Sequence, residues 1–321
     1  MPAQNLGIMK LSDGAVTHLK FPNQPLIRVR NLKIPEGARV TKGSLSRDGD
    51  GWRVSLGLVT PAKPAPAPVV DSVGMDVGLR VLAYAASDAT GFEIVANNPR
   101  PLQQAEQRLV RSQHKLSRRR QGSVGRRRAA REVGRRHKRV ADLRAAHHHR
   151  VSRRIVNAAG AITVETLSVQ AMMRTRLAKS VTDAAPGGLL RQLAYKAAWA
   201  GRRFTALGRW DRSTGCCPDC GRVGRRLPIG QDVWTCPSCG TVHDRDRAAA
   251  RWLDRCGIEI RSSEAAHAAD EGGRRSPEPA PKVPKRGSAG GVKEWPRRSA
   301  ASGPPANVPS AADQTARAST G

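Results

Sequence analysis

Two CxxC motifs limit the folds open to this chain more than any other feature of its sequence. Cys217 and Cys220 form the first pair, Cys236 and Cys239 form the second, and 15 residues separate the pairs. This spacing is typical of a zinc ribbon, in which each short turn directs two thiolates toward one ion. Four sulfur ligands complete a tetrahedral shell, so we expect a structural rather than a catalytic Zn²⁺ at these cysteines.

The remaining cysteines predict no further metal chemistry. A redox dithiol is the alternative for the CxxC pairs, and Cys216 could compete as a ligand, although we interpret it as a small neighbouring residue. Cys256 is expected to be a buried helical thiol.

The chain begins without the basic start and apolar block of a signal peptide, and it has no run of 18 apolar residues. We therefore predict a cytoplasmic protein that does not contact membranes.

The charge balance points to a polyanionic partner. The chain of 321 residues contains 56 Lys and Arg against 26 Asp and Glu, a formal net charge of +30. A compact body with this charge repels itself unless a partner neutralises it. Aromatic residues make up only 3% of the chain, which argues against binding single strands mainly by stacking.

Composition changes along the chain divide it into segments. Residues 1–60 are predicted to be β-rich, with an alternating strand at 51–59, and the Pro/Ala stretch 61–68 is a linker. The main domain is expected at 69–259, with a helical segment at 100–158 and the ribbon at 213–243. Beyond Ile260 the sequence is rich in Ser, Gly, Pro and charge, so we predict a disordered tail over 260–321.

The helical segment is strongly basic. Residues 107–154 hold 18 Lys and Arg and 2 acidic residues, and a glycine-containing break at 121–125 predicts a helical hairpin. Such a surface suits phosphate backbones, although a solvated charged surface is the alternative. The expected nucleic-acid contacts are Arg118, Arg119, Arg120, Arg126, Arg127, Arg128, Arg135 and Arg136. Consecutive helical residues point in different directions, so His147, His148 and His149 are not expected to share a metal ion.

Three acidic residues occur in apolar or helical contexts. Burying a carboxylate there costs free energy unless the group is paired or binds a metal. Asp76 lies within an apolar strand, Glu165 ends the strand that begins near Ala161, and Asp246 stands in the first turn of a helix. Small residues on that helix would let it lie close to a sheet. Three such groups can hold a pair of Mg²⁺ ions for phosphodiester hydrolysis. The alternatives are a turn residue at a strand end for Asp76, a pairing with Arg for Glu165, and a helix N-cap and a first-turn acid for Asp244 and Asp246; spacing alone does not prove that the acids converge.

The motifs taken together, in their order, resemble the TnpB or OrfB family of transposon-encoded proteins, which is related to type V CRISPR effectors. The resemblance covers residues 28–259 and rests on GMDVGL, ADLRAAHHHRVSRRIV, ITVETLSV, YKAAWAGRRF and the cysteine region through HDRDRAAA. It implies an α/β, RNase H-like (RuvC-type) nuclease domain with a helical-hairpin insertion and a four-Cys zinc ribbon, preceded by a small β-rich segment.

The resemblance also implies an activity and its residues. Asp76, Glu165 and Asp246 match the family's catalytic acids and would bind Mg²⁺, while Asp244 would cap the last helix. Family members cleave DNA with a guide RNA from their own element, so DNA and such an RNA are the expected partners, in transposition or DNA recombination. Two departures predict weakened activity: Ala248 replaces an Asn, and the family's N-terminal recognition helices are expected to be absent.

Three hypotheses follow for the function. The first is a Mg²⁺-dependent, RNA-guided DNA endonuclease. The second is a truncated, catalytically weak or inactive DNA- or RNA-binding zinc-ribbon protein. The third is a zinc-ribbon transcription or translation factor, which would leave GMDVGL and ITVETL unexplained. Nicking of DNA that depends on Mg²⁺ distinguishes the first from the other two.

Overall fold

The N-terminal part of the chain is built from antiparallel strands. The computed structural model describes residues 6–10, 15–48, 51–61, 64–208, 211, 213–224, 227–228 and 230–270. Strands β1 (Gly7–Lys10), β2 (Ala15–Lys20) and β3 (Ile27–Lys33) form one sheet, and β4 (Arg39–Asp48) pairs with β5 (Gly51–Val59) in a hairpin. The strand predicted at 51–59 coincides with β5. Leu19, Phe21 and Ile34 are among the residues that form a small core here.

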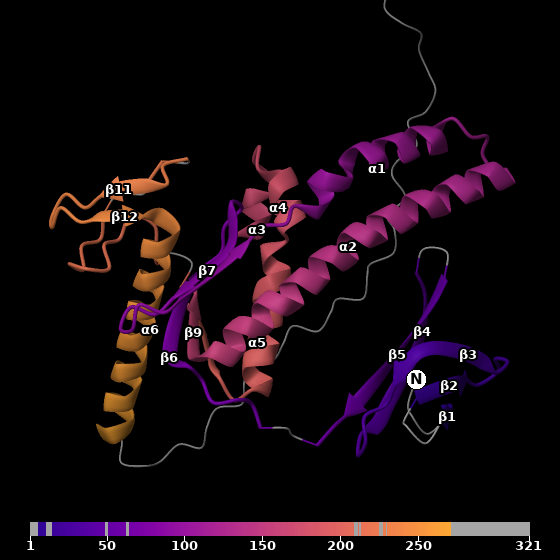
Figure 1. Cartoon of the computed structure of the whole chain (residues 1–321), viewed down its shortest axis with the longest axis horizontal. Helices are drawn as coiled ribbons and strands as arrows, with labels where there is room; N and C mark the ends of the chain where they lie inside the picture. Colours follow the sequence, from indigo (N-terminus) through magenta and orange to yellow (C-terminus); the bar gives the residue numbers. More distant parts are fainter. Residues whose placement is uncertain are drawn as a thin grey trace, which may run out of the picture. The chain divides into compact units, whose positions relative to one another are not determined.

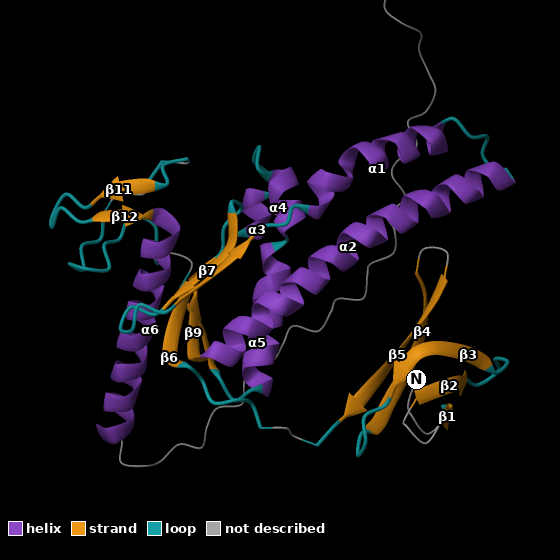
Figure 2. Cartoon of the chain, in the orientation of Figure 1, coloured by secondary structure: helices purple, strands orange, loops and turns teal. Residues whose placement is uncertain are grey.

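A five-stranded mixed sheet forms the centre of the larger part (Figure 2). Its strand order is β10-β9-β6-β7-β8, with antiparallel pairs along β6, β7 and β8 and parallel pairs along β6, β9 and β10. The strands are β6 (Val70–Asp76), β7 (Val81–Ala86), β8 (Glu93–Asn97), β9 (Ala159–Val164) and β10 (Arg203–Ala206).

Helices cover the two faces of this sheet. Helix α2 (Val124–Ala158) and helix α5 (Pro186–Trp199) pack on one face, where Val73, Met75 and Ile162 join the main core. Helix α6 (Arg245–Asp270) packs against β6, β7 and β9 from the other face (Figure 1). Because successive side chains of a strand alternate between faces, Gly74 and Asp76 point to the α6 side.

The basic hairpin predicted at 100–158 is formed by α1 (Pro101–Ser117) and α2. The turn between them contains Gly122, which has a φ of 75°, and Ser123 caps α2 by accepting a hydrogen bond from the Arg126 amide at 3.1 Å. Short helices α3 (Val169–Met172) and α4 (Ala178–Ala184) lead from β9 to α5.

The C-terminal part contains the ribbon and a final helix that is longer than the sequence predicted. Strands β11 (Val233–Thr235) and β12 (Val242–Asp244) pair antiparallel and lead directly into α6. The predicted disordered tail from Ile260 is wrong over its first residues, because α6 continues to Asp270. Ala265, Ala266, Ala268 and Ala269 favour helix, although they offer little to bury. Residues 271–321 lie outside the described part of the chain.

Candidate active site and metal centre

Asp76 and Glu165 are neighbours at the ends of two parallel strands. The register pairs Gly74 with Thr163 and Met75 with Val164, so Asp76 and Glu165 are the next residues along β6 and β9. Adjacent strands lie about 4.8 Å apart, and residues in register point to the same face. The sheet therefore brings two carboxylates to one edge on the face that α6 covers.

Asp246 reaches this edge from the first turn of α6. Ala249, Ala250 and Leu253 are almost fully buried against the sheet, as the small-residue pattern predicted. The closest approach is at Gly74, where a Cβ atom would lie 2.1 Å from the carbonyl oxygen of Ala250. A glycine in the centre of β6 thus lets α6 lie directly on the strand that ends in Asp76.

Burial and mutual repulsion act on these carboxylates. Burial raises the pKa of Asp76 well above its ordinary value of 3.8, and the negative charges of Glu165 and Asp246 raise it further. Burial also raises the pKa of Asp246. The three acids therefore interact electrostatically, and a cation placed among them would offset the cost of ionising Asp76.

Two further side chains donate hydrogen bonds to these carboxylates. Ser213 donates its hydroxyl to Glu165 at 2.8 Å, and the Arg80 guanidinium donates to Asp246 at 3.0 Å. Arg80 also lies 3.6 Å from Asp232 and 3.8 Å from Asp244. Ser213 and Arg80 could not be identified from the sequence, because their contacts join segments far apart in the chain.

The oxygens of the three acids are more widely spaced than the ligands of a single compact metal site. Among the described residues, the groups whose ligand atoms all lie within 4.8 Å of one another involve the cysteine region and not these carboxylates. Two ions shared by three acids need a wider arrangement, with the ions themselves about 3.5–4 Å apart.

Asp244 and Ala248 lie at the start of α6 and have different contacts. Asp244 caps the helix, as expected, by accepting a hydrogen bond from the Arg247 amide at 2.9 Å. Ala248 is buried in a small core with Cys217, Trp234 and Cys236. Since residues two positions apart point to nearly opposite sides of a helix, Ala248 faces the ribbon while Asp246 faces the sheet.

The four CxxC cysteines lie together, as their spacing predicted. Their sulfur atoms all lie within 4.8 Å of one another, with Cys217–Cys239 and Cys220–Cys236 separations of 3.7 Å. A tetrahedron with metal–sulfur bonds of ~2.3 Å has sulfur–sulfur edges of ~3.8 Å. The donor set and its dimensions therefore fit one tetrahedral ion.

Polar contacts hold the ribbon on the sheet. His243 Nε2 lies 3.1 Å from the Cys217 sulfur, and Arg251 bridges Asp219 of the first CxxC turn to Asp88 after β7, at 2.7 and 2.8 Å. Because Asp88 and Asp219 come from separate elements, this bridge fixes the cysteine site relative to the strands that carry the acids.

Seven of the eight predicted arginine contacts of the basic hairpin fall into two groups, and the eighth, Arg135, is exposed but already interacts within the protein. Arg126 donates to the carbonyl oxygens of Leu116 and Arg119, and Arg127 donates to that of Gly122, so both stabilise the turn. Arg136 pairs with Glu132 at 3.0 Å. The exposed side chains without a structural role of this kind are the better candidates for phosphate contacts: Arg118, Arg119, Arg120 and Arg128.

Two of the three consecutive histidines have side chains that contact backbone carbonyl groups. His147 and His148 interact through Nε2 with the carbonyl oxygens of Asn97 and Ala184, both at 3.0 Å. Burial lowers the pKa of His148 to about 4, so it is neutral at physiological pH. The metal-ligand groups found among the described residues do not include these histidines.

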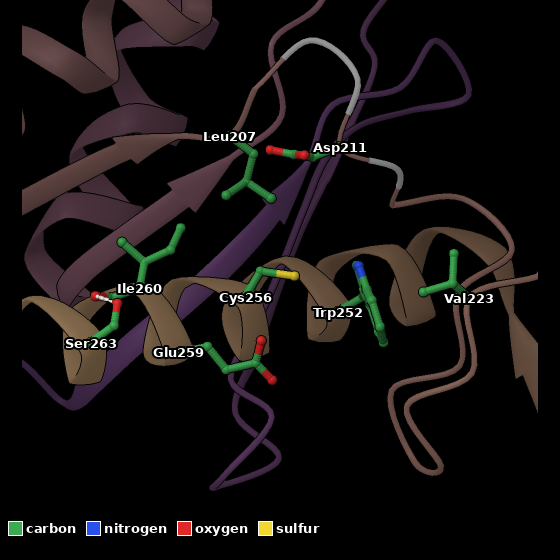
Figure 3. Close-up of a pocket in the computed structure, with 8 residues that line it drawn as sticks. All are labelled: Leu207, Asp211, Val223, Trp252, Cys256, Glu259, Ile260 and Ser263. Carbon is green, nitrogen blue, oxygen red and sulfur yellow. Dashed lines mark hydrogen bonds between the residues drawn. The ribbon is translucent and has the colours of Figure 1, made fainter.

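A separate cavity of ≈ 680 Å³ runs along the outer side of α6 (Figure 3). Trp252, Cys256 and Ile260 line it from the helix, and Leu207 and Val223 line it from the segments opposite. Burial raises the pKa of Cys256 to about 11, so this thiol is protonated and unreactive at neutral pH.

Among the described residues, no helix combines the length and apolar composition that crossing a bilayer requires.

Two family models and several curated proteins match this chain. Residues 55–176 match the OrfB_IS605 family, described as "Probable transposase", and residues 187–253 match the "Cas12f1-like, TNB domain" family. A "Putative RNA-guided DNA endonuclease" of Streptomyces pristinaespiralis is 38% identical over 227 residues, which are 70% of this chain and 55% of that protein. One from Mycobacterium tuberculosis is 34% identical over 239 residues, 71% of this chain and 51% of that protein.

The chain therefore spans about half the length of the curated relatives it matches. A solved CRISPR-Cas12f ternary complex aligns with a TM-score of 0.44 and 16% identity, over 68% of this chain and 44% of that one. The two family matches and the relatives of 34–38% identity carry the assignment. On this evidence, the chain belongs to the TnpB/OrfB family of transposon-encoded proteins.

Proposed function

We propose that this chain is a Mg²⁺-dependent DNA endonuclease with an RNase H-like (RuvC-type) domain, guided by RNA. The proposal is supported by the placement of Asp76 and Glu165 at neighbouring strand ends, with Asp246 on the helix that covers the same face; burial and the charges of Glu165 and Asp246 raise the pKa of Asp76. The sheet order supports the RuvC-type assignment, since three antiparallel strands are followed by two parallel ones. The relatives' names support the RNA-guided activity.

Asp76, Glu165 and Asp246 would hold Mg²⁺, whose preferred ligands are hard carboxylate oxygens. Bound Mg²⁺ would supply a water of lowered pKa and would stabilise the leaving oxygen. The protein's own residues position the acids: the β6–β9 register sets Asp76 beside Glu165, and Ser213 orients Glu165 through its hydrogen bond. Arg80 neutralises part of the charge on Asp246.

The ribbon would hold one Zn²⁺ through Cys217, Cys220, Cys236 and Cys239. A closed four-sulfur shell leaves no position for a reacting water, so this ion would be structural. Through the buried contacts of Ala248 and the Arg251 bridge, the ribbon would fix the first turn of α6 and hence Asp246. The exposed arginines of the α1–α2 hairpin would contact phosphates of DNA or of a guide RNA.

The test uses the full chain purified with RNA from its own element, offered target DNA with and without Mg²⁺. Asp76→Asn and Asp246→Asn should each abolish cleavage, because each removes a metal ligand. Asp244→Asn is the matched control, since Asn caps a helix as well as Asp does, and it should leave cleavage intact. Cleavage that persists in Asp76→Asn, or that needs no divalent ion, would refute the proposed site.

A further inference from the structure

The C-terminal end of α5 carries a pair of aromatic side chains directed away from the core. Trp199 is 80% exposed, more than any other large apolar side chain that the structure describes. Its ring lies 4.6 Å from that of Tyr195 in an edge-on arrangement at 61°. The buried stripe of α5, at Leu193 and Ala197, occupies the opposite side of the helix.

A single exposed apolar residue is ordinary on a protein surface and needs no explanation. This pair differs because the Tyr195 ring contacts the Trp199 ring on one side, while most of the Trp199 side chain remains exposed. Trp and Tyr bury large areas at little entropic cost, and every nucleobase offers a flat surface on which such a ring can stack.

The segments that carry and face the pair contain basic but no acidic residues. Helix α5 contains no Asp or Glu, and the stretch from Leu143 to Val164, which includes the facing half of α2, contains none either. Burial lowers the pKa of Lys196, and the positive charge of Arg153 on α2 lowers it further and also acts on Tyr195. Lys196 donates to the His149 carbonyl oxygen at 2.9 Å and to the Ser152 hydroxyl at 2.6 Å, so it links α5 to α2.

Arg153 is exposed, and it makes no ion pair with the described residues. Its guanidinium is therefore available to an anionic group that approaches the rings of Tyr195 and Trp199. A flat hydrophobic ligand linked to an anion is the chemistry that this surface matches, and a nucleotide with an unpaired base is such a ligand.

We infer that Trp199 and Tyr195 form a stacking site for an unpaired base of single-stranded nucleic acid, with Arg153 binding the adjacent phosphate. The site lies on α5, on the face of the sheet opposite to the one that α6 covers (Figure 1). It is thus separate from Asp76, Glu165 and Asp246. It would hold a strand without cleaving it, and it goes beyond the proposed endonuclease activity.

The test measures binding of labelled oligodeoxythymidine and oligouridine to the full chain without Mg²⁺, so a failure of the nuclease proposal cannot affect the result. Trp199→Ala should weaken binding about fivefold or more, since stacking of one base on an aromatic ring contributes that much. Trp199→Phe should restore most of the affinity. The two strands distinguish DNA from RNA as the preferred ligand.

Three controls show whether a loss of binding depends on a base that stacks on Trp199. An abasic strand of the same length should bind wild type and Trp199→Ala equally, because it offers phosphates but no base. Trp52→Ala removes an indole that is 69% exposed on β5, and it should leave affinity unchanged. Thermal unfolding should shift little in Trp199→Ala, as for other exposed positions.

Wild-type affinity of Trp199→Ala for both strands would overturn the inference. An equal loss with the abasic strand or in Trp52→Ala would do the same, because the effect would then not depend on a base at this site. A large loss of thermal stability, or a changed oligomeric state on size-exclusion chromatography, would show that Trp199 is covered by protein instead.

Discussion

Gly74 of β6 and Ala250 of α6 are in backbone contact: a Cβ atom at Gly74 would lie 2.1 Å from the carbonyl oxygen of Ala250. The same atom would lie 2.2 Å from the Asp254 amide nitrogen. Backbone atoms cannot move aside as a flexible side chain can. The distance between Asp76, which ends β6, and Asp246, which begins α6, therefore depends on a glycine at position 74.

Gly74→Ala should push α6 away from the sheet. We expect a loss of about 3 kcal/mol or more in the free energy of unfolding, because overpacking against rigid backbone is costly. Divalent-ion binding at the carboxylates should weaken as well. Chemical denaturation and calorimetric titration with Mg²⁺ measure the two effects.

The matched control for this prediction is Gly125→Ala in the first turn of α2. A Cβ atom there would meet side-chain atoms at 3.7 Å and beyond, so alanine should be neutral or slightly stabilising. If Gly74→Ala were as stable as Gly125→Ala, α6 would not lie on β6 as described.

Asp76→Asn should make the protein more stable in the absence of divalent ions. The pKa of Asp76 is raised in the folded state, so folding favours its protonated form, and stability is lost as pH rises from the ordinary value of 3.8 through the folded value. Asn removes this cost at neutral pH. The melting temperature should rise by roughly 2–4 °C for each kcal/mol regained.

Addition of Mg²⁺ separates this explanation from a general packing effect. Wild type should gain thermal stability from Mg²⁺, because an ion that binds only the folded state shifts the unfolding equilibrium. Asp76→Asn should gain much less. Equal gains in both proteins, or a lower melting temperature of Asp76→Asn, would contradict the role assigned to Asp76.

Cys217→Ser should reduce the zinc content of the purified chain well below one ion per molecule and destabilise the start of α6. Cys217 packs with Trp234 and Ala248, so loss of the ion would disturb this core. Elemental analysis by mass spectrometry measures the zinc content. Cys256→Ser is the control, because Cys256 lies outside the group of four, and it should retain zinc fully.

Replacing Arg118, Arg119 and Arg120 together by Gln should make nucleic-acid binding less sensitive to salt. Each lost phosphate contact should lower the slope of log K against log salt concentration by about 0.9 on duplex DNA. Arg136→Gln should leave the slope unchanged, because Arg136 is paired with Glu132. Anisotropy titrations over a range of salt concentrations measure these slopes, and equal slopes in all three proteins would contradict a phosphate-binding hairpin.

Local patterns in the sequence predicted much of what the structure contains. The CxxC spacing predicted four clustered cysteines, and the glycine-containing break at 121–125 predicted the turn between α1 and α2. Asp244 could be identified as a helix cap from its place before an Ala-rich stretch. These features succeed because each depends on residues close together in the chain, whose chemistry is the same in any fold.

The extent of α6 was missed for a related reason. The sequence after Ile260 has few apolar residues, and the prediction relied on burial rather than on helix propensity. In the structure the helix continues on Ala-rich sequence, and Glu264 pairs with Arg203 at the start of β10.

The sequence by itself determined the residue types of the two candidate metal sites: four thiolates at fixed spacing, and three acids in apolar or helical contexts. The tertiary structure alone decided that Asp76 and Glu165 lie at neighbouring strand ends and that α6, which carries Asp246, packs on the same face, because the parallel register of β6 and β9 and the contact of α6 with Gly74 are long-range. It alone placed Arg80 on Asp246 and Ser213 on Glu165. The physical reason is that such contacts form between segments that only the packed core brings within a few ångströms.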